Sequence, residues 1–242
     1  MSARAFYIVG PTAVGKSEIA AEVARRIGGE IVSADAFQVY AGLDLLTAKP
    51  EAGTLRIVPH HLIGTVSLTE EMNAERFRRE ALTAMESIER PIVVGGSGLY
   101  VRALTDGLSP LPAADDAIRA QLEQCTEREL FIRLERLDPA TAATIDRENK
   151  RRLIRALEIC LVTHRPASEL RQTKPNRTAR GVLLFREREE LQRRINERVV
   201  RMFADGVVEE VRQLGEVSET AAKTLGLAQV RELLAGRIFE HE

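Results

Sequence analysis

The sequence predicts an α/β fold with a mostly parallel sheet and a small helical insertion. Four short apolar runs are typical of buried strands, at residues 5–9, 30–34, 91–94 and 181–185. Helical periodicity alternates with the first three of these runs, which is the order of elements in a parallel sheet covered by helices. From about residue 112 to 148 the pattern is helical throughout. We therefore expect a core of residues 1–111 and 149–242, with residues 112–148 inserted into it.

The stretch after the first strand fits the phosphate-binding pattern G-x-x-x-x-G-K-[ST] at every fixed position. It consists of Gly10, Pro11, Thr12, Ala13, Val14, Gly15, Lys16 and Ser17. Glycines let the backbone wrap around an anion, so that several N–H groups and a helix N-terminus point at one phosphate. Lys16 adds a positive charge, and Ser17 offers a hydroxyl to a phosphate-bound Mg²⁺. We therefore expect a P-loop NTPase-like core whose loop binds a diphosphate or polyphosphate, with Ser17 as a metal ligand.

Apolar residues at helical spacing predict the main helices. An amphipathic stretch follows the loop, with Ile19, Val23, Ala24 and Ile27 on its apolar face. Residues 73–89 are expected to form a helix with Asn73 as its N-cap. Residues 150–163 are expected to form another, which turns its arginines outward and buries Leu153, Leu157 and Leu161.

Polar residues at the strand ends are candidates for a site, because ligands of open α/β sheets bind outside the carboxyl ends of the strands. Asp35 ends the second strand and would stand beside the P-loop as a helix cap, a Mg²⁺ ligand or a base. Ser97, in a glycine turn after the third strand, is placed to contact a phosphate or a ribose. Lys49, in the loop after the second strand, faces either solvent or a second phosphate. His60 and His61 suggest metal, but adjacent side chains do not easily face one site, so we favour a polar loop or strand edge.

The charge is unevenly distributed along the chain. The net charge of the 242 residues is −1, yet residues 147–201 hold 16 Lys and Arg against 7 Asp and Glu, which leaves −10 for the rest. Such asymmetry indicates a face for a polyanion. In residues 186–198 the interleaved glutamates favour an ordinary solvated helix face. Lys150, Arg151, Arg152 and Arg155 have few acidic neighbours and favour anion binding.

The composition is that of an ordinary globular protein, with 44% hydrophobic and 29% charged residues. No apolar run approaches the roughly 18 residues of a membrane span. The chain enters its first strand directly after Arg4, so no signal peptide is expected. Cys125 and Cys160 form no ligand cluster and are interpreted as small hydrophobic residues. We expect a cytoplasmic monomer with no membrane partner.

Several further stretches, in the same order as the P-loop, resemble the tRNA dimethylallyltransferase (tRNA isopentenyltransferase) family. They are residues 33–40, 42–44, 47–50, 59–62, 95–100, 107–112, 149–158 and 194–211. The similarity runs from about residue 5 to about residue 236. Ser97-Gly98 stands where the family often has Thr and a larger residue. Family members usually continue several tens of residues past Gly236, through a basic helix that meets the tRNA, so the resemblance includes a shortened C-terminus with an expected effect on tRNA affinity.

The resemblance implies transfer of a dimethylallyl group from dimethylallyl diphosphate to N6 of an adenosine at position 37, next to the anticodon of tRNA, with Mg²⁺ as cofactor. It implies catalytic roles for Asp35, Lys16 and Ser97. It also implies tRNA contacts at Asp35, Ala36, Phe37, Gln38, Ser97, Arg119, Arg151, Arg152, Leu153, Ile154 and Arg155. An adenine amino group is a poor nucleophile, and Asp35 is the acid at a motif strand end that could accept its proton. The target base would have to leave the anticodon-loop stack to reach it.

Three other functions stay open from the sequence. An isopentenyltransferase of free adenine nucleotides fits the shorter chain but does not need the basic run 150–155. A small-molecule kinase would use the same loop with ATP but leaves the motif from Asp35 to Pro50 unexplained. A non-catalytic nucleotide- or tRNA-binding remnant would be expected to lack Lys16 or Asp35, and both are present.

Overall fold

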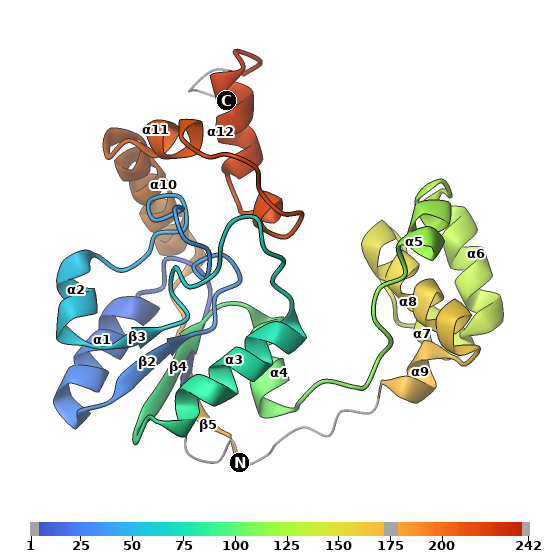
Figure 1. The fold of residues 1–242 in the computed structure, drawn as a ribbon, viewed down its shortest axis with the longest axis horizontal. Helices are drawn as coiled ribbons and strands as arrows, with labels where there is room; N and C mark the ends of the chain where they lie inside the picture. The colour runs from blue at the N-terminus through green and yellow to red at the C-terminus, as the bar shows by residue number, and fades with distance from the viewer. Residues whose placement is uncertain (1–4, 172–178, 239–242) are drawn as a thin grey trace. The chain divides into compact units, whose positions relative to one another are not determined.

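The computed structural model describes residues 5–171 and 179–238, and in these the chain divides into two compact units (Figure 1). The first unit is Met1–Asp106 with Asn176–Glu242, and the second is Gly107–Pro175. The second unit is larger than the predicted insertion of residues 112–148, because the helix that follows the insertion packs with it and not with the sheet. Within the described residues no helix is long and apolar enough to cross a membrane.

The first unit is built on a five-stranded sheet of order β3-β2-β4-β1-β5. The strands are β1 (Phe6–Val9), β2 (Glu30–Ser33), β3 (His60–His61), β4 (Pro91–Gly95) and β5 (Arg180–Leu183). Every paired register in the sheet is parallel. The first three predicted strands are confirmed within one residue at each end, and the fourth ends at Leu183, two residues before its predicted end. The paired histidines form β3, at one edge of the sheet.

Helices cover both faces of this sheet (Figure 1). Those of the first unit are α1 (Lys16–Ile27), α2 (Ala52–Ile57), α3 (Ala74–Glu86), α4 (Gly98–Thr105), α10 (Arg188–Ala204), α11 (Val207–Arg212), the 3-10 helix η1 (Ala221–Lys223) and α12 (Leu227–Leu234). The strands alternate their side chains between faces. Ile8 therefore belongs to the cluster around α1, whereas its neighbour Tyr7 belongs to the cluster around α3 and α4. Phe77 of α3 stacks on Tyr100 of α4 at 4.1 Å between ring centroids.

Two details of the helix predictions differ in outcome. Asn73 caps α3 as predicted, because its side chain accepts a hydrogen bond from the amide of Arg76 at 2.9 Å. The predicted apolar face of α1 is only partly right. Ala20 and Ala24 are buried, but Ile19 and Ile27 are each 41% exposed.

The second unit is helical and has its own core. Its helices are α5 (Asp116–Glu123), α6 (Glu127–Leu137), α7 (Pro139–Ala142), α8 (Lys150–Thr163) and α9 (Ala167–Leu170). Leu153 and Leu157 of α8 pack with Leu130 and Leu134 of α6, which explains why α8 belongs here. The bounds of α8 agree with the prediction, but Leu161 is 39% exposed and the neighbouring Cys160 is buried instead.

Candidate functional site

The P-loop joins β1 to α1 and has a backbone that its glycines make possible. A Cβ at Gly10 would lie 2.5 Å from the carbonyl oxygen of Leu184, so no larger residue fits there. Gly15 has φ 101°, a left-handed conformation, immediately before α1 begins at Lys16. Ala13 is also left-handed, with φ 61°. The loop thus presents the N-terminus of α1 at the carboxyl edge of the sheet.

The glycine turn after β4 lies against the P-loop. A Cβ added to Gly95 would lie 2.2 Å from the carbonyl oxygen of Ala34, and one added to Gly96 would lie 3.1 Å from that of Gly10. The ends of β1, β2 and β4 are therefore close together at one edge of the sheet. Ser97 follows in this turn, and its Oγ accepts a hydrogen bond from the amide of Ala36 at 3.0 Å.

Asp35 begins a tight turn at the end of β2. Its Oδ1 accepts hydrogen bonds from the amides of Phe37 at 2.9 Å and Gln38 at 3.3 Å. These bonds fix the position of the carboxylate, as in an Asx turn. Ser97 supports the same turn from the β4 side, so in this structure its hydroxyl organises the backbone next to Asp35.

Asp35 and the P-loop line a single cavity of about 750 Å³. Lys16, Ser17 and Gln38 also line it, together with the loop after β2 and part of α10. Lys16 Nζ donates to the carbonyl oxygen of Pro11 at 2.7 Å. Burial lowers the pKa of Lys16, and the nearby charge of Asp35 opposes this shift. Lys16, predicted to bind the diphosphate, and Asp35, predicted to accept a proton, therefore line the same cavity.

The oxygen groups of this cavity suit Mg²⁺ held through phosphate. Ser17 supplies a hydroxyl at the start of α1, and Asp35 supplies a carboxylate to the same cavity. Hydroxyl and carboxylate oxygens are the ligands that Mg²⁺ prefers. Among the residues that the structure describes, no three His, Cys, Asp or Glu side chains come together as a metal site. This donor set fits an ion that arrives with a phosphate better than one held by the protein alone.

Three arginines contact the P-loop, one just before α10 and two on it, and the sequence did not predict these contacts. Arg186, just before α10, donates from Nε to the carbonyl oxygen of Val14 at 2.9 Å. Arg194 donates from Nε to that of Ala13 at 2.7 Å. Arg198 donates from Nη1 to Thr12 Oγ1 at 3.2 Å, and it lines the cavity. Burial lowers the pKa of Arg198. The prediction of a solvated helix face is wrong for these three residues, because Arg194 and Arg198 lie on the face of α10 that meets the loop and Arg186 reaches the loop from just before the helix.

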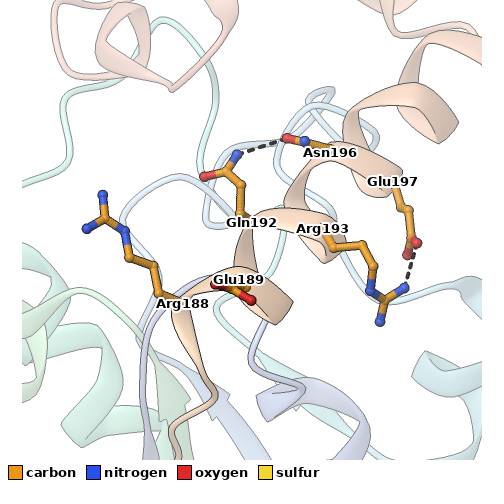
Figure 2. Close-up of a pocket in the computed structure, with 6 residues that line it drawn as sticks. All are labelled: Arg188, Glu189, Gln192, Arg193, Asn196 and Glu197. Carbon is orange, nitrogen blue, oxygen red and sulfur yellow. Dashed lines mark hydrogen bonds and ion pairs between the residues drawn. The ribbon is translucent and has the colours of Figure 1, made fainter.

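The opposite face of α10 is solvated as predicted. Figure 2 shows a shallow hollow there, lined by Arg188, Glu189, Gln192, Arg193, Asn196 and Glu197. Gln192 Nε2 donates to Asn196 Oδ1 at 2.9 Å, and Arg193 forms an ion pair with Glu197 at 2.6 Å. These side chains point outward and pair with one another along the helix. The functional cavity lies on the other side.

In the second unit, Arg119 and Arg155 both bind the buried carboxylate of Glu158. Arg119 Nε lies 2.8 Å from Glu158 Oε1, Arg155 Nη1 donates to Oε2, and the amide of Asp115 donates to Oε1 at 2.7 Å. Burial opposes ionisation of Glu158, but the bond from Arg155 and these other donors outweigh it and lower the pKa. Arg155 also donates to the carbonyl oxygen of Pro112 at 2.7 Å. Both arginines therefore hold this unit together.

The other residues of the predicted basic run differ in their surroundings. Leu153 and Ile154 are buried in the core of the second unit, so their side chains are not available to an RNA. Lys150 Nζ donates to the carbonyl oxygen of Glu123 at 2.7 Å. Arg151 and Arg152 are exposed on α8. The cationic surface of this segment consists mainly of these last two side chains.

Lys49, in the loop after β2, and the two histidines of β3 all have partners within the protein. The side chain of Lys49 is 6% exposed and forms an ion pair with Asp44 at 2.6 Å, so it braces the loop. His60 Nδ1 lies 2.7 Å from the carbonyl oxygen of Val58, and His61 Nε2 lies 2.7 Å from Glu30 Oε2. The two histidines thus have different partners, as a polar strand edge requires, and burial lowers the pKa of His60.

Comparisons with known proteins agree on one family. A model of the family described as IPP transferase matches residues 38–242. The "tRNA dimethylallyltransferase 1" of Citrifermentans bemidjiense is 45% identical over 241 residues, which cover 95% of this chain and 79% of that protein. The solved structure of the tRNA isopentenylpyrophosphate transferase of Bacillus halodurans has a TM-score of 0.64 at 32% identity, covering 98% of this chain and 79% of that one. The corresponding transferase of Staphylococcus epidermidis has a TM-score of 0.64 at 28% identity, with 98% and 82% covered.

Proposed function

The chain belongs to the IPP transferase family, and from this premise we propose that it transfers a dimethylallyl group from dimethylallyl diphosphate to N6 of an adenosine at position 37 of tRNA, releasing diphosphate. The observation that carries the proposal is the shared cavity. The P-loop and the carboxyl group of Asp35 line the same space of about 750 Å³. That is the arrangement needed to bring a diphosphate ester and a nitrogen nucleophile together.

The leaving group is assigned to the P-loop. When the bond between the allylic carbon and the diphosphate oxygen breaks, its electron pair leaves with the diphosphate, and negative charge grows there. Loop amides, Lys16 and Arg198 are positioned to stabilise this charge. Lys16 exchanges its bond to the Pro11 carbonyl oxygen for one to the diphosphate. Lys16 and Arg198 are partly buried, which strengthens these interactions because water screens them less.

The acceptor is assigned to the end of β2. The new bond joins N6 of the adenine to the allylic carbon, and one N6 proton goes to the carboxylate of Asp35. The amides of Phe37 and Gln38 hold this carboxylate in place. Ser97 acts on the same turn through the amide of Ala36. Preorganisation of this kind keeps the base within reach of the flipped nucleotide.

We propose Mg²⁺ as the cofactor, with Ser17 and a diphosphate oxygen as ligands. When bound, the ion would neutralise part of the diphosphate charge. For the tRNA, the support in the second unit lies with the exposed Arg151 and Arg152, whereas Arg119 and Arg155 are engaged by Glu158.

The decisive experiment offers two acceptors, an unmodified tRNA anticodon stem-loop and AMP, each with dimethylallyl diphosphate, and follows them by mass spectrometry. We expect a prenylated stem-loop and little or no prenylated AMP. Asp35→Asn should abolish transfer, because the amide keeps the shape of the side chain but cannot take the proton. As a control, this variant should still bind dimethylallyl diphosphate, and added diphosphate should displace it. Prenylated AMP with unmodified RNA would favour the free-nucleotide enzyme, and an active Asp35→Asn would exclude Asp35 as the base.

A further inference from the structure

The loop after β2 contains a compact turn over residues 43–49 that borders the cavity. The amide of Ala48 donates to the carbonyl oxygen of Leu45 at 3.0 Å, and the amide of Lys49 donates to the carbonyl oxygen of Asp44 at 3.0 Å. The turn therefore resembles a short piece of helix, whose first amides point away from its own carbonyls. Leu45, Thr47 and Ala48 all line the cavity.

The first amides of this turn are capped by a residue about 165 positions away in the sequence. Glu210 of α11 accepts from the amide of Leu45 with Oε1 at 2.7 Å and from that of Leu46 with Oε2 at 2.9 Å. A carboxylate at the start of a helical turn satisfies free amides and interacts favourably with their dipoles. Both oxygens are used, so the carboxylate fixes the turn in position and in orientation.

The other end of the turn is fixed by Gln38. Its Nε2 donates to the carbonyl oxygens of Thr47 at 3.2 Å and Ala48 at 3.1 Å. Its backbone amide donates to Asp35 Oδ1 at 3.3 Å. A continuous set of hydrogen bonds thus runs from Glu210 through the turn to Gln38 and ends on the carboxylate at the acceptor side of the cavity.

Helix α11 follows α10 after Gly206, which is left-handed with φ 95°. The segment formed by α10 and α11 therefore contacts two sides of the cavity, the P-loop and the 43–49 turn. Arg194 and Arg198 of α10 bind the P-loop, and Glu210 of α11 binds the 43–49 turn. Because this segment contacts both, it sets the distance between the P-loop and the 43–49 turn.

We propose that Glu210 is a positioning residue for the transfer reaction: acting through the 43–49 turn and Gln38, it keeps the Asp35 carboxylate in register with the diphosphate site. The proposal rests on the proposed function. It assigns a catalytic contribution to a carboxylate that touches neither the base nor the diphosphate.

The test compares Glu210→Ala with Glu209→Ala. Glu209 is the preceding residue on α11, is half exposed, and pairs with Arg212, so it is a matched control. At saturating substrates the single-turnover rate of Glu210→Ala should fall roughly 10- to 100-fold, as displacement of a reacting group by about 1 Å does. The KM for dimethylallyl diphosphate should change little, because the P-loop keeps its own contacts. Glu209→Ala should keep the wild-type rate.

A double-mutant cycle separates positioning from general stability. If Glu210 acts through Gln38, Glu210→Ala and Gln38→Ala combined should slow the reaction about as much as the more severe single variant. Losses that multiply would overturn the proposal, and so would a normal rate in Glu210→Ala. If Glu210→Ala does not fold, Glu210→Gln carries the same test, because it keeps the size and one acceptor oxygen, and it should be intermediate in rate.

Hydrogen exchange supplies a readout that does not depend on activity. The amides of Leu45 and Leu46 should exchange faster in Glu210→Ala and at the wild-type rate in Glu209→Ala. Unchanged exchange in Glu210→Ala would refute the cap. If the wild-type protein transfers no prenyl group to RNA, the proposed function fails, while the exchange experiment still shows whether Glu210 holds the turn.

Discussion

Replacing Arg194 with Met tests whether α10 holds the P-loop in its binding conformation. Arg194 donates to the carbonyl oxygen of Ala13 at 2.7 Å, and Ala13 has the left-handed φ of 61°. A left-handed L-residue costs about 1–2 kcal/mol, so this part of the loop needs support. A hydrogen bond from a charged donor contributes about 1.5–3 kcal/mol. Methionine keeps most of the side-chain length and removes the donor.

The loss of about 1.5–3 kcal/mol lowers the equilibrium constant for the binding conformation roughly 10- to 150-fold. We therefore expect kcat/KM for dimethylallyl diphosphate, measured by mass spectrometry at saturating RNA, to fall by up to about that factor. Arg193→Met is the control, because Arg193 is adjacent but forms an exposed pair with Glu197 that is worth only about 0.3–0.5 kcal/mol. If the kcat/KM values of Arg194→Met and Arg193→Met lie within about threefold of each other, Arg194 has no role in shaping the loop.

Three further predictions concern other parts of the chain. Lys16→Ala should raise the barrier of single-turnover transfer by about 2–4 kcal/mol and leave tRNA binding nearly unchanged, and a near-normal rate would exclude the loop as the leaving-group site. Arg152→Ala should reduce the salt dependence of tRNA binding, measured by filter binding, by about one phosphate contact, whereas Arg155→Ala should chiefly lower the thermal stability of the protein by uncovering Glu158. Burial opposes ionisation of Asp138, but four hydrogen bonds from Thr141 and Ser168 outweigh it and lower the pKa below the ordinary 3.8. This carboxylate therefore stabilises the fold at pH values above 3.8 and ceases to do so as the pH falls through its lowered pKa, so Asp138→Asn should be less stable at neutral pH and should show a flatter acid-unfolding curve.

The parts of the fold that local patterns determine could be predicted from the sequence. Glycines at fixed spacing, with a buried strand before them and a helix after, defined the P-loop and placed Asp35 beside it. Asn149 caps α8, which begins at Lys150 as predicted. Successive side chains of α8 point about 100° apart, so Cys160 and Leu161 do not both face the core. The packing of the second unit buries Cys160 and leaves Leu161 exposed.

The parts that depend on tertiary contacts could not be predicted. Arg193 and Arg194 are neighbours in a run with interleaved glutamates, and sequence spacing does not show which of them faces the loop. Arg155 was predicted to bind an anion because it has few acidic neighbours in the sequence, and only the structure shows that the buried Glu158 engages it. The boundary at residue 149 was wrong for the same reason, since only the packing of Leu153 and Leu157 on α6 assigns α8 to the second unit.

The position of the second unit within the chain affects the order in which the protein assembles during translation. Strand β1 lies between β4 and β5, but β5 leaves the ribosome only after the second unit has been made. The arginines that support the P-loop emerge later still, because α10 follows β5. Helical contacts within α5–α9 are local and can form early. Because the completed unit shortens the effective loop between β4 and β5, its early folding favours later closure of the sheet, and the site is completed last.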